Sequence, residues 1–263
     1  MTDSPRVALV TGAARGIGAA TVAALAAAGW RVVAVDRCAD EPALPYALGS
    51  RAELDAVAAA SAPAAVAVAV ADTRDPDALA AAVRLAEERW GGLDAAIAAA
   101  GVIAGGVPAW ELDPKQEQAV LDVNLGGVLT AARVGVPAML KRPAPREGRF
   151  VAVASAASTR GLPNLAAYCA AKAGVVGFVR ALAVELGGTG VTANAVSPGS
   201  TRTKILDESA RLYEIEVEAF ADQQPIKRLL EPEEVAAMIG FLASPGSRGA
   251  TGGNFPVDGG LAL

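Results

Sequence analysis

Three side chains within one stretch of the sequence could together carry acid–base chemistry: Ser155, Tyr168 and Lys172. If Tyr168 opens a helix, the four-residue step to Lys172 places the ammonium on the same helical face as the phenol. A free phenol has a pKa near ~10, and a neighbouring cation lowers it toward the range useful at neutral pH. Ser155, at the end of a strand, could hydrogen-bond the same substrate oxygen. The spacing therefore predicts an acid–base site that needs no histidine, and the chain contains none.

Taken alone, a Tyr-x-x-x-Lys pair favours a plainer interpretation, a packing tyrosine and a solvated lysine, because short motifs recur by chance. The interpretation therefore depends on the elements that position the pair. Short apolar runs alternate with longer helical patterns, which predicts an α/β protein with a parallel sheet and crossover helices. Strands are expected at residues 7–10, 31–35, 66–70, 93–98, 149–154, 191–196 and 254–257. Helices are expected at 17–28, 77–90, 114–140, 168–186 and 232–242.

The composition excludes several classes of protein. Only 4% of the 263 residues are aromatic while 53% are hydrophobic, so the core should consist largely of Ala, Val and Leu. The net charge is −5 and no block of Lys or Arg occurs, which argues against a nucleic-acid partner. Without histidine, and with only Cys38 and Cys169, neither a metal site nor a disulfide scaffold is expected.

The sequence also predicts a cytoplasmic protein without a membrane segment. Residues 1–6 lack the apolar core of a signal peptide. The longest uncharged run, 95–110, is shorter than the ~18 residues that a membrane span needs. No linker or internal repeat interrupts residues 1–263, which are therefore expected to form one domain.

Two long segments do not fit the alternation of strands and helices. Residues 38–63, after the second strand, carry an irregular stretch before a helical patch at 52–60, and read as an insertion. Residues 200–227 follow a Pro-Gly pair and form a long amphipathic segment, which we expect to be a mobile lid. Loops of this length inside compact domains are usually functional or disordered.

A glycine-rich turn follows the first strand and predicts a nucleotide site. Gly12, Gly16 and Gly18 give the spacing Gly-x-x-x-Gly-x-Gly directly before a helix. Glycines there let the backbone approach a pyrophosphate, and a helix N-terminus offers free N–H groups and a positive dipole end. Simple strand-to-helix packing is the alternative, but the flanking strand and helix favour nucleotide binding.

Asp36, at the end of the second strand, indicates which dinucleotide binds. A carboxylate there can accept hydrogen bonds from the adenosine ribose and would repel a 2′-phosphate. Arg15 and Arg37 favour the opposite preference, since either could pair with a 2′-phosphate. We give Asp36 the greater weight and predict NAD, with Asp72 placed to meet the adenine edge.

Taken together, these residues resemble the short-chain dehydrogenase/reductase family over essentially the whole chain. The matching motifs are Thr11-Gly12-x-x-x-Gly16-x-Gly18, Val123-Asn124-Leu125-Gly126, Ser155, Tyr168-x-x-x-Lys172, Pro198-Gly199 and Val257-Asp258-Gly259-Gly260. The resemblance implies a Rossmann-type, doubly wound sheet of seven strands with helices on both faces, a nicotinamide cofactor and a homotetramer.

The resemblance also implies a role for each matching residue. Tyr168 would exchange a proton with the alcohol or carbonyl oxygen, and Ser155 would polarise that oxygen. Lys172 would lower the pKa of Tyr168 and hold the nicotinamide ribose, while Asn124 would hold a water that links Lys172 to solvent. Besides Tyr168 and Lys172, the expected cofactor-binding residues are Gly12, Arg15, Gly16, Ile17, Gly18, Asp36, Arg37, Asp72, Thr73, Ala99, Ala100, Gly101, Pro198, Gly199, Thr201 and Thr203.

Two features depart from the family pattern. Ala98-Ala99-Ala100-Gly101 replaces the usual Asn-Asn-Ala-Gly, which puts polar bracing of this loop in doubt but leaves backbone contacts to the ribose. The insertion at 38–63 resembles the mycofactocin-associated subgroup, which includes carveol dehydrogenase-like proteins. That likeness implies that the insertion covers the adenosine half and keeps NAD bound between turnovers. A neutral surface insertion is the alternative, because loops tolerate length changes.

The sequence thus favours an NAD(H)-dependent enzyme that interconverts an apolar secondary alcohol and its ketone. Val102, Ile103, Ala156, Ala157 and Leu162 are expected to line the substrate pocket together with lid residues 205–220, which suggests a terpenoid-, steroid- or fatty-like substrate over a sugar or an acid. In the subgroup, mycofactocin would accept the electrons. The alternatives are a 3-oxoacyl-acyl carrier protein reductase, against which Asp36 and the acidic charge argue, and a non-catalytic NAD-binding protein.

Overall fold

Seven parallel strands form one sheet, in the order β3-β2-β1-β4-β5-β6-β7. The computed structural model describes residues 5–62 and 64–263. The strands are β1 (Val7–Thr11), β2 (Arg31–Asp36), β3 (Val66–Val70), β4 (Ala95–Ala98), β5 (Arg149–Val153), β6 (Thr192–Pro198) and β7 (Asn254–Val257). The strand order reverses between β1 and β4, and ligands bind at the carboxyl ends of strands at such a switch point.

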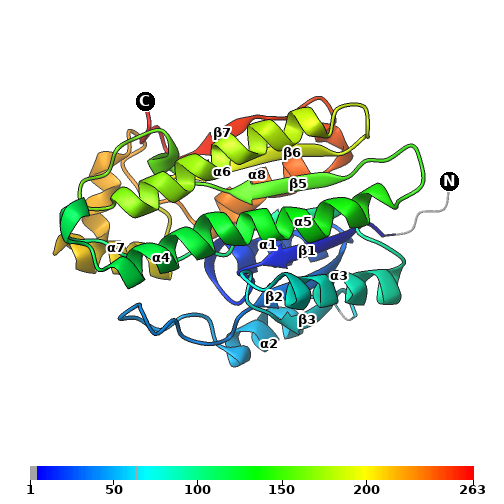
Figure 1. Ribbon diagram of the computed structural model, residues 1–263, viewed down its shortest axis with the longest axis horizontal. Helices are drawn as coiled ribbons and strands as arrows, with labels where there is room; N and C mark the ends of the chain where they lie inside the picture. The colour runs from blue at the N-terminus through cyan, green and yellow to red at the C-terminus, as the bar shows by residue number, and fades with distance from the viewer. Residues whose placement is uncertain (1–4, 63) are drawn as a thin grey trace.

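Helices cover both faces of this sheet (Figure 1). They are α1 (Gly16–Ala27), α2 (Arg51–Ala59), α3 (Pro76–Trp90), α4 (Pro114–Leu121), α5 (Gly127–Leu140), α6 (Ala166–Glu185), α7 (Lys204–Tyr213) and α8 (Pro232–Ala243). Helices α3, α5 and α6 pack on one face, and α1, α2 and α8 pack on the other. The predicted fold class, a doubly wound seven-stranded parallel sheet, is therefore confirmed.

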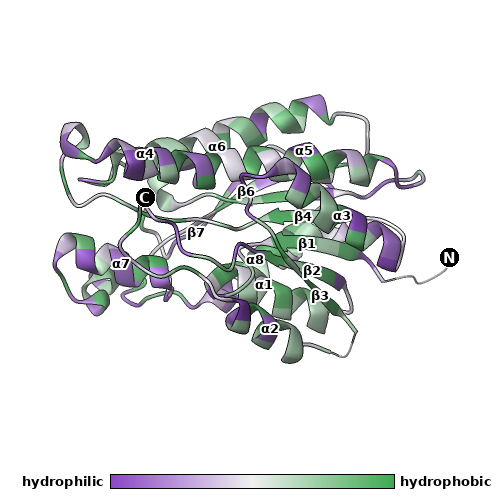
Figure 2. Cartoon of the chain, turned by 60° about the horizontal axis from the view of Figure 1, so that its bottom comes forward, coloured by the Kyte–Doolittle hydropathy of each residue, from purple (hydrophilic) through white to green (hydrophobic). Residues whose placement is uncertain are grey.

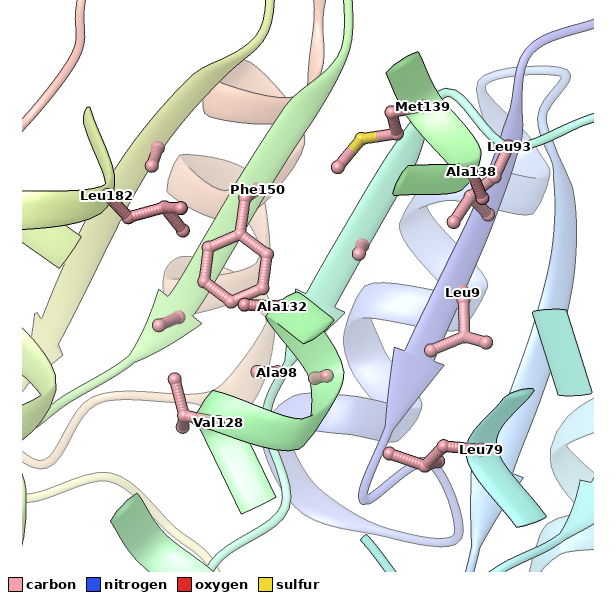
Figure 3. Packing of buried hydrophobic residues seen from close by; sticks show 14 of the residues in the cluster. Leu9, Leu79, Leu93, Ala98, Val128, Ala132, Ala138, Met139, Phe150 and Leu182 are labelled. Atoms are coloured by element: carbon pink, nitrogen blue, oxygen red, sulfur yellow. The ribbon is translucent and has the colours of Figure 1, made fainter. Parts of the chain in front are cut away.

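The core follows from the alternation of side chains along each strand. Leu9 and Phe150 point to the α3–α5–α6 face, where they pack with Leu79, Val128 and Ala132 (Figure 3). The next residues along β1 belong to the cluster on the opposite face. Apolar side chains therefore fill both interfaces of the sheet. Figure 2 shows hydrophobic residues along the central strands and hydrophilic residues on the helices.

Small side chains let α5 lie close to the sheet, as the alanine-rich composition suggested. A Cβ at Gly135 would lie only 2.8 Å from the Cβ of Ala96 on β4. A larger residue at either position would push the helix away from the strand, because protein interiors are close-packed.

Most of the predicted elements are present with small differences in their bounds, but three expectations need correction. The strand predicted at 93–98 begins at Ala95. Tyr168 does not open its helix, because α6 begins two residues earlier at Ala166. The single helix predicted at 114–140 is divided by a π-helical turn, Asp122–Gly126, so that α4 and α5 are joined by one wider turn.

The two long segments are partly ordered by helices. Residues 38–50 form no helix or strand, and α2 follows them, with Ser50 and Glu53 forming a capping box at its N-terminus. The segment at 200–227 contains α7 and a 3₁₀ stretch, Val217–Gln223. Residues 1–4, used above to argue against a signal peptide, and Pro63, the end of the predicted insertion, lie outside the described residues.

Two helical stretches, 114–140 and 166–185, are long and apolar enough to cross a membrane by length and composition alone. However, 56% and 50% of their most apolar windows are buried inside the protein. This burial is what helices packed on a central sheet require, since one side of each must face the core.

Candidate active site

A cavity of about 600 Å³ opens at the carboxyl ends of the strands. Every residue predicted to bind cofactor lines it, and so do Ser155, Tyr168 and Lys172. Asn124 lies behind the wall instead, fully buried. The fold therefore brings the glycine-rich turn and the Ser-Tyr-Lys set, more than a hundred residues apart in the sequence, to one cavity.

At one end of the cavity, the glycine-rich turn needs its glycines for steric reasons. Gly12 has a φ of +68°, and a Cβ there would lie 2.6 Å from the Cα of Ala100. A Cβ at Gly18 would collide with the carbonyl oxygen of Gly12. Arg15 precedes α1 without a side-chain cap, so the first-turn N–H groups have no side-chain partner in the described chain. Such groups at a helix N-terminus suit a pyrophosphate.

The loop after β4 is braced by Thr11, which answers the doubt raised by its missing asparagines. The hydroxyl oxygen of Thr11 accepts hydrogen bonds from the backbone N–H groups of Ala99 and Ala100, at 3.2 and 3.3 Å. Thr11 reaches them because it pairs with Ala98 across the β1–β4 ladder. Polar bracing is therefore present, from the neighbouring strand rather than from the loop itself.

Asp36 faces the cavity from the end of β2. Its carboxylate accepts hydrogen bonds from the N–H groups of Ala14, at 3.1 Å, and Cys38, at 3.2 Å. These two bonds fix the carboxylate and leave acceptor capacity, since an ionised carboxylate has about four lone-pair sites. The position suits recognition of two ribose hydroxyls.

Arg37, which could have favoured a 2′-phosphate, is engaged by acidic neighbours. It pairs with Glu41 at 2.7 Å and with Asp72 at 3.3 Å. Arg74 pairs with the same two carboxylates, at 2.9 and 2.7 Å. Burial pushes the pKa of Asp72 upward, but hydrogen bonds from Arg74 and the nearby cations outweigh it and hold the pKa below its usual value. This end of the cavity is thus rich in paired charges.

At the other end, Lys172 and Tyr168 are both buried. The ammonium of Lys172 donates to the carbonyl oxygen of Val153 at 2.9 Å and lies 5.7 Å from the centre of the Tyr168 ring. The hydroxyl oxygen of Ser155 accepts from the N–H of Ala157 at 3.1 Å, which orients it beside the phenol. The one-turn spacing thus places the ammonium and the ring on one face of α6, as the sequence predicted.

The expected lowering of the tyrosine pKa is not found. Burial raises the pKa of Tyr168 to about 12, and the hydroxyl of Ser155 opposes this rise only in part. Burial also lowers the pKa of Lys172 to about 8. Both shifts have one physical cause: the low-dielectric interior disfavours phenolate and ammonium alike.

Asn124 acts on the wall of the cavity. Its side-chain amide donates to the carbonyl oxygen of Val102 at 2.8 Å, and its amide oxygen accepts from the Val102 N–H at 3.0 Å. The π turn places the residue there, and such turns often occur at functional sites. A Cβ at Gly101 would lie 2.9 Å from the Asn124 amide oxygen and 3.6 Å from the Lys172 nitrogen. The water relay through Asn124 stays a prediction.

Comparison with known proteins agrees with this geometry. Residues 12–262 match the sequence family described as Enoyl-(Acyl carrier protein) reductase. A 2-dehydro-3-deoxy-L-rhamnonate dehydrogenase (NAD(+)) of Sphingomonas sp. (strain SKA58) is 37% identical over 97% of this chain and 94% of its own. A 3-oxoacyl-[acyl-carrier-protein] reductase of Synechocystis sp. (strain ATCC 27184 / PCC 6803 / Kazusa) is 36% identical over 98% and 97%.

The crystal structure of carveol dehydrogenase from Mycobacterium avium in complex with NAD superposes with a TM-score of 0.91. It is 31% identical, and the match covers 98% of both chains. The chain belongs to the short-chain dehydrogenase/reductase family. The predicted enzyme class and the likeness to carveol dehydrogenase are thereby confirmed, and the relatives named with NAD agree with the predicted cofactor.

Within this short-chain dehydrogenase/reductase, the insertion contributes cavity residues that the sequence did not reveal. Tyr46 and Leu48 line the cavity. The Tyr46 hydroxyl accepts from the N–H of Ile103 at 2.8 Å and donates to its carbonyl oxygen at 3.1 Å. Arg15 donates to the carbonyl oxygen of Ala47 at 2.7 Å. No local pattern marks Tyr46, because its partner lies 57 residues away.

The substrate walls agree with the prediction except at one residue. Val102, Ile103, Ala156, Leu162 and the lid residues Ile205, Tyr213 and Phe220 line the cavity. Ala157 does not, because its side chain is buried in the cluster behind the wall. Arg160 and Leu261 also line the cavity and were missed. The chain's end could not be placed there from sequence alone.

Proposed function

We propose that the protein uses NAD(H) to interconvert a secondary alcohol of apolar body and its ketone. The observation that carries the proposal is the meeting of Tyr168, Lys172 and Ser155 in one cavity with Asp36 and the glycine-rich turn. One end of this cavity suits an adenosine diphosphate group, and the other holds the acid–base set. An NAD nicotinamide bound between them supplies the hydride acceptor or donor.

The protein's own residues manage the proton. For oxidation, Tyr168 takes the hydroxyl proton of the substrate, and for reduction it returns one to the carbonyl oxygen. Ser155 hydrogen-bonds the same oxygen and stabilises the charge that develops on it. Lys172, while protonated, stabilises the phenolate form that oxidation requires. Asn124 fixes Val102, which forms part of the cavity wall.

The names of the relatives do not agree on a substrate class, since they include a sugar acid, a carrier-bound acyl chain and cyclic alcohols. Val102, Ile103 and Leu162 belong to the apolar cluster that contains Tyr168, and Phe220 also lines the cavity. Such walls favour an apolar ring or chain around the carbinol carbon, because burying its surface is favourable at roughly 25 cal/mol per Å².

The same geometry favours NAD over NADP. Asp36 is fixed at the ribose position by Ala14 and Cys38. Arg37 is held by Glu41 and Asp72, so it is not free to neutralise a 2′-phosphate. A phosphate beside Asp36 would face a like charge, while Arg15, which also lines the cavity, donates to the carbonyl oxygen of Ala47 and has no carboxylate partner within the described residues.

The insertion supports a further proposal, that NAD stays bound between turnovers and that mycofactocin accepts its electrons. Residues 38–50 run from the ribose position to Ile103, where the Tyr46 phenol bonds both backbone groups. Arg15 holds the same segment through Ala47. A dinucleotide beneath this segment could leave only after these bonds open.

The first experiment is to purify the protein without added cofactor, pass it through gel filtration, denature it and assay the released nucleotide. Near-stoichiometric NAD or NADH supports retention, and Tyr46→Phe should then release it faster. Tyr213→Phe is the matched control, because that phenol bonds Pro163 and not the insertion. If the protein emerges without nucleotide but oxidises alcohols when NAD is added, the proposed dehydrogenase function stands and the proposal that NAD is retained is wrong.

The competing functions make different demands. A 3-oxoacyl-acyl carrier protein reductase should prefer NADPH and offer a basic docking surface, whereas this chain carries Asp36 and a net charge of −5. A non-catalytic NAD-binding protein would keep its biological role in a Tyr168→Phe variant. We further propose a cytoplasmic homotetramer, which light scattering of the purified protein would test.

A further inference from the structure

The charges that line the cavity are divided unevenly between its two ends. Its only carboxylates among the described lining residues, Asp36 and Asp72, lie at the adenosine end. The substrate end has none, yet it carries Arg160 in addition to Lys172. Lys204, which lies near Arg15 and Ala47, is paired with Asp207 at 3.0 Å, whereas Arg160 takes part in no ion pair within residues 5–62 and 64–263.

Backbone hydrogen bonds hold the main chain of Arg160 in place relative to Ser155 and Tyr168. Its N–H donates to the carbonyl oxygen of Ala156 at 3.0 Å, directly after Ser155. Its own carbonyl oxygen faces the sulfur of Cys169, next to Tyr168, at 4.0 Å. The loop beyond it is tied to its neighbours as well, since Asn164 accepts from the Gly106 N–H at 3.0 Å. The base of this side chain is therefore fixed to both sides of the acid–base site.

The guanidinium lies at the exposed mouth of the cavity and is only partly used. One nitrogen donates to the carbonyl oxygen of Leu261 at 2.7 Å. In the part of the chain that the structure describes, the other N–H groups of the guanidinium have no acceptor. A guanidinium presents its donors as a planar fork, which matches the two oxygens of a carboxylate.

We propose that Arg160 is a specificity-determining residue that binds a carboxylate on the substrate, at the end remote from the carbinol carbon. This inference rests on the proposed dehydrogenase function. It keeps the apolar body of the substrate but departs from the sequence-based expectation, which favoured an apolar substrate over an acid. The substrate is then an apolar ring or short chain that carries a hydroxyl group at one end and a carboxylate at the other. One unpaired cation at the mouth balances one such anion.

A matched pair of substrates tests this inference: cis-4-hydroxycyclohexanecarboxylate and cyclohexanol, which share the ring and the carbinol carbon. In the wild type, kcat/KM should be higher for the carboxylate. In Arg160→Gln the ratio of the two kcat/KM values should fall about tenfold, the low end for a hydrogen bond to a charged group. The loss should appear in KM, because the contact is equally present in ground and transition states.

Controls separate recognition from a structural role. Arg84→Gln removes an exposed positive charge from α3, outside the cavity, and should leave the ratio unchanged. Arg160→Lys should keep part of the preference. The preference should also weaken as salt rises, because the site is exposed to screening. If Arg160→Gln lowers both kcat/KM values equally, Arg160 serves only to hold Leu261 and the proposal is wrong.

A binding measurement covers the case in which neither alcohol is oxidised. Calorimetry on the NAD-loaded protein would compare cyclohexanecarboxylate with cyclohexanecarboxamide. Tighter binding of the carboxylate by the wild type, absent in Arg160→Gln, supports the inference even if the proposed reaction fails on this ring. Equal affinities for the two compounds overturn the inference while leaving the dehydrogenase proposal intact.

Discussion

The two ends of the cavity are built in different ways for the ligands proposed above. At the proposed adenosine end, most contacts would come from the backbone: Gly12 and Gly18 permit close approach, and Asp36 is fixed by backbone N–H groups. At the substrate end, side chains from distant segments converge, with Phe220 from the lid and Leu261 from the chain's end. A site formed by the backbone changes little when single residues are replaced. A site walled by side chains can acquire a different substrate specificity through single substitutions.

The substitution with the largest expected effect, Tyr168→Phe, tests whether proton transfer depends only on the substrate end of the cavity. Tyr168→Phe removes the proposed proton carrier, so kcat for alcohol oxidation should fall by about 10²–10⁴-fold. NAD binding should be largely kept, because Asp36 and the glycine-rich turn are untouched. Steady-state kinetics would measure kcat, and titration with the nucleotide would measure NAD binding. Activity within about twofold of the wild type would remove Tyr168 from the acid–base role.

Asp36→Ser tests the adenosine end in the same manner. Without the carboxylate, a 2′-phosphate meets no like charge, so the NAD-to-NADP ratio of kcat/KM should fall about tenfold or more. The ratio should not depend on which alcohol is used. An unchanged ratio would mean that the ion-paired cluster around Arg37, rather than Asp36, excludes NADP.

The Thr11→Val substitution tests the hydrogen bonds that hold the loop after β4. Thr11 is buried, and its loss leaves the N–H groups of Ala99 and Ala100 without their acceptor. We expect a loss of about 1–3 kcal/mol in the free energy of unfolding. Thr11→Ser, which keeps the hydroxyl, should lose less, and chemical denaturation would compare the two. Equal losses would assign the effect to packing.

The smallest effect is the pH dependence of the substrate end. Oxidation needs the phenolate of Tyr168, whose pKa is raised to about 12, so the fraction ionised grows as pH rises. Reduction needs the protonated phenol, which stays abundant below that value. Far below that pKa the ionised fraction grows about tenfold per pH unit, so oxidation should rise about tenfold from about pH 7 to 8 while reduction does not rise. Loss of the Lys172 charge above about pH 8 should flatten the rise. Oxidation that falls with pH would contradict this assignment.

What could be predicted from the sequence was local. The strand, the glycine-rich turn and the helix that follow one another at residues 7–27 carry their own spacing, and Tyr168 and Lys172 lie one helical turn apart. These patterns predicted the fold and the expected cofactor-binding residues, all of which line the cavity. They depend on neighbours in the sequence, which physical rules relate directly.

What the sequence could not give was contact between distant segments. The brace from Thr11 to Ala99 depends on the register of β1 against β4, and Tyr46 reaches Ile103 only once the insertion folds back. The tyrosine pKa was misjudged for a related reason. Burial depends on everything packed around Tyr168, whereas the sequence showed only the nearby lysine.

The π turn at Asp122–Gly126 has a consequence for protein engineering. An α-helix advances about 100° per residue, so the extra residue in this turn puts α4 and α5 out of rotational phase. If residues 114–140 were drawn as one regular α-helix on a helical wheel, the residues after the turn would be rotated relative to their true directions. Their buried and exposed faces would therefore be assigned wrongly. Deleting a single residue within the turn would restore that continuity and swing Asn124 away from Val102. Alignments that allow a gap here would misplace the residue on which the cavity wall depends.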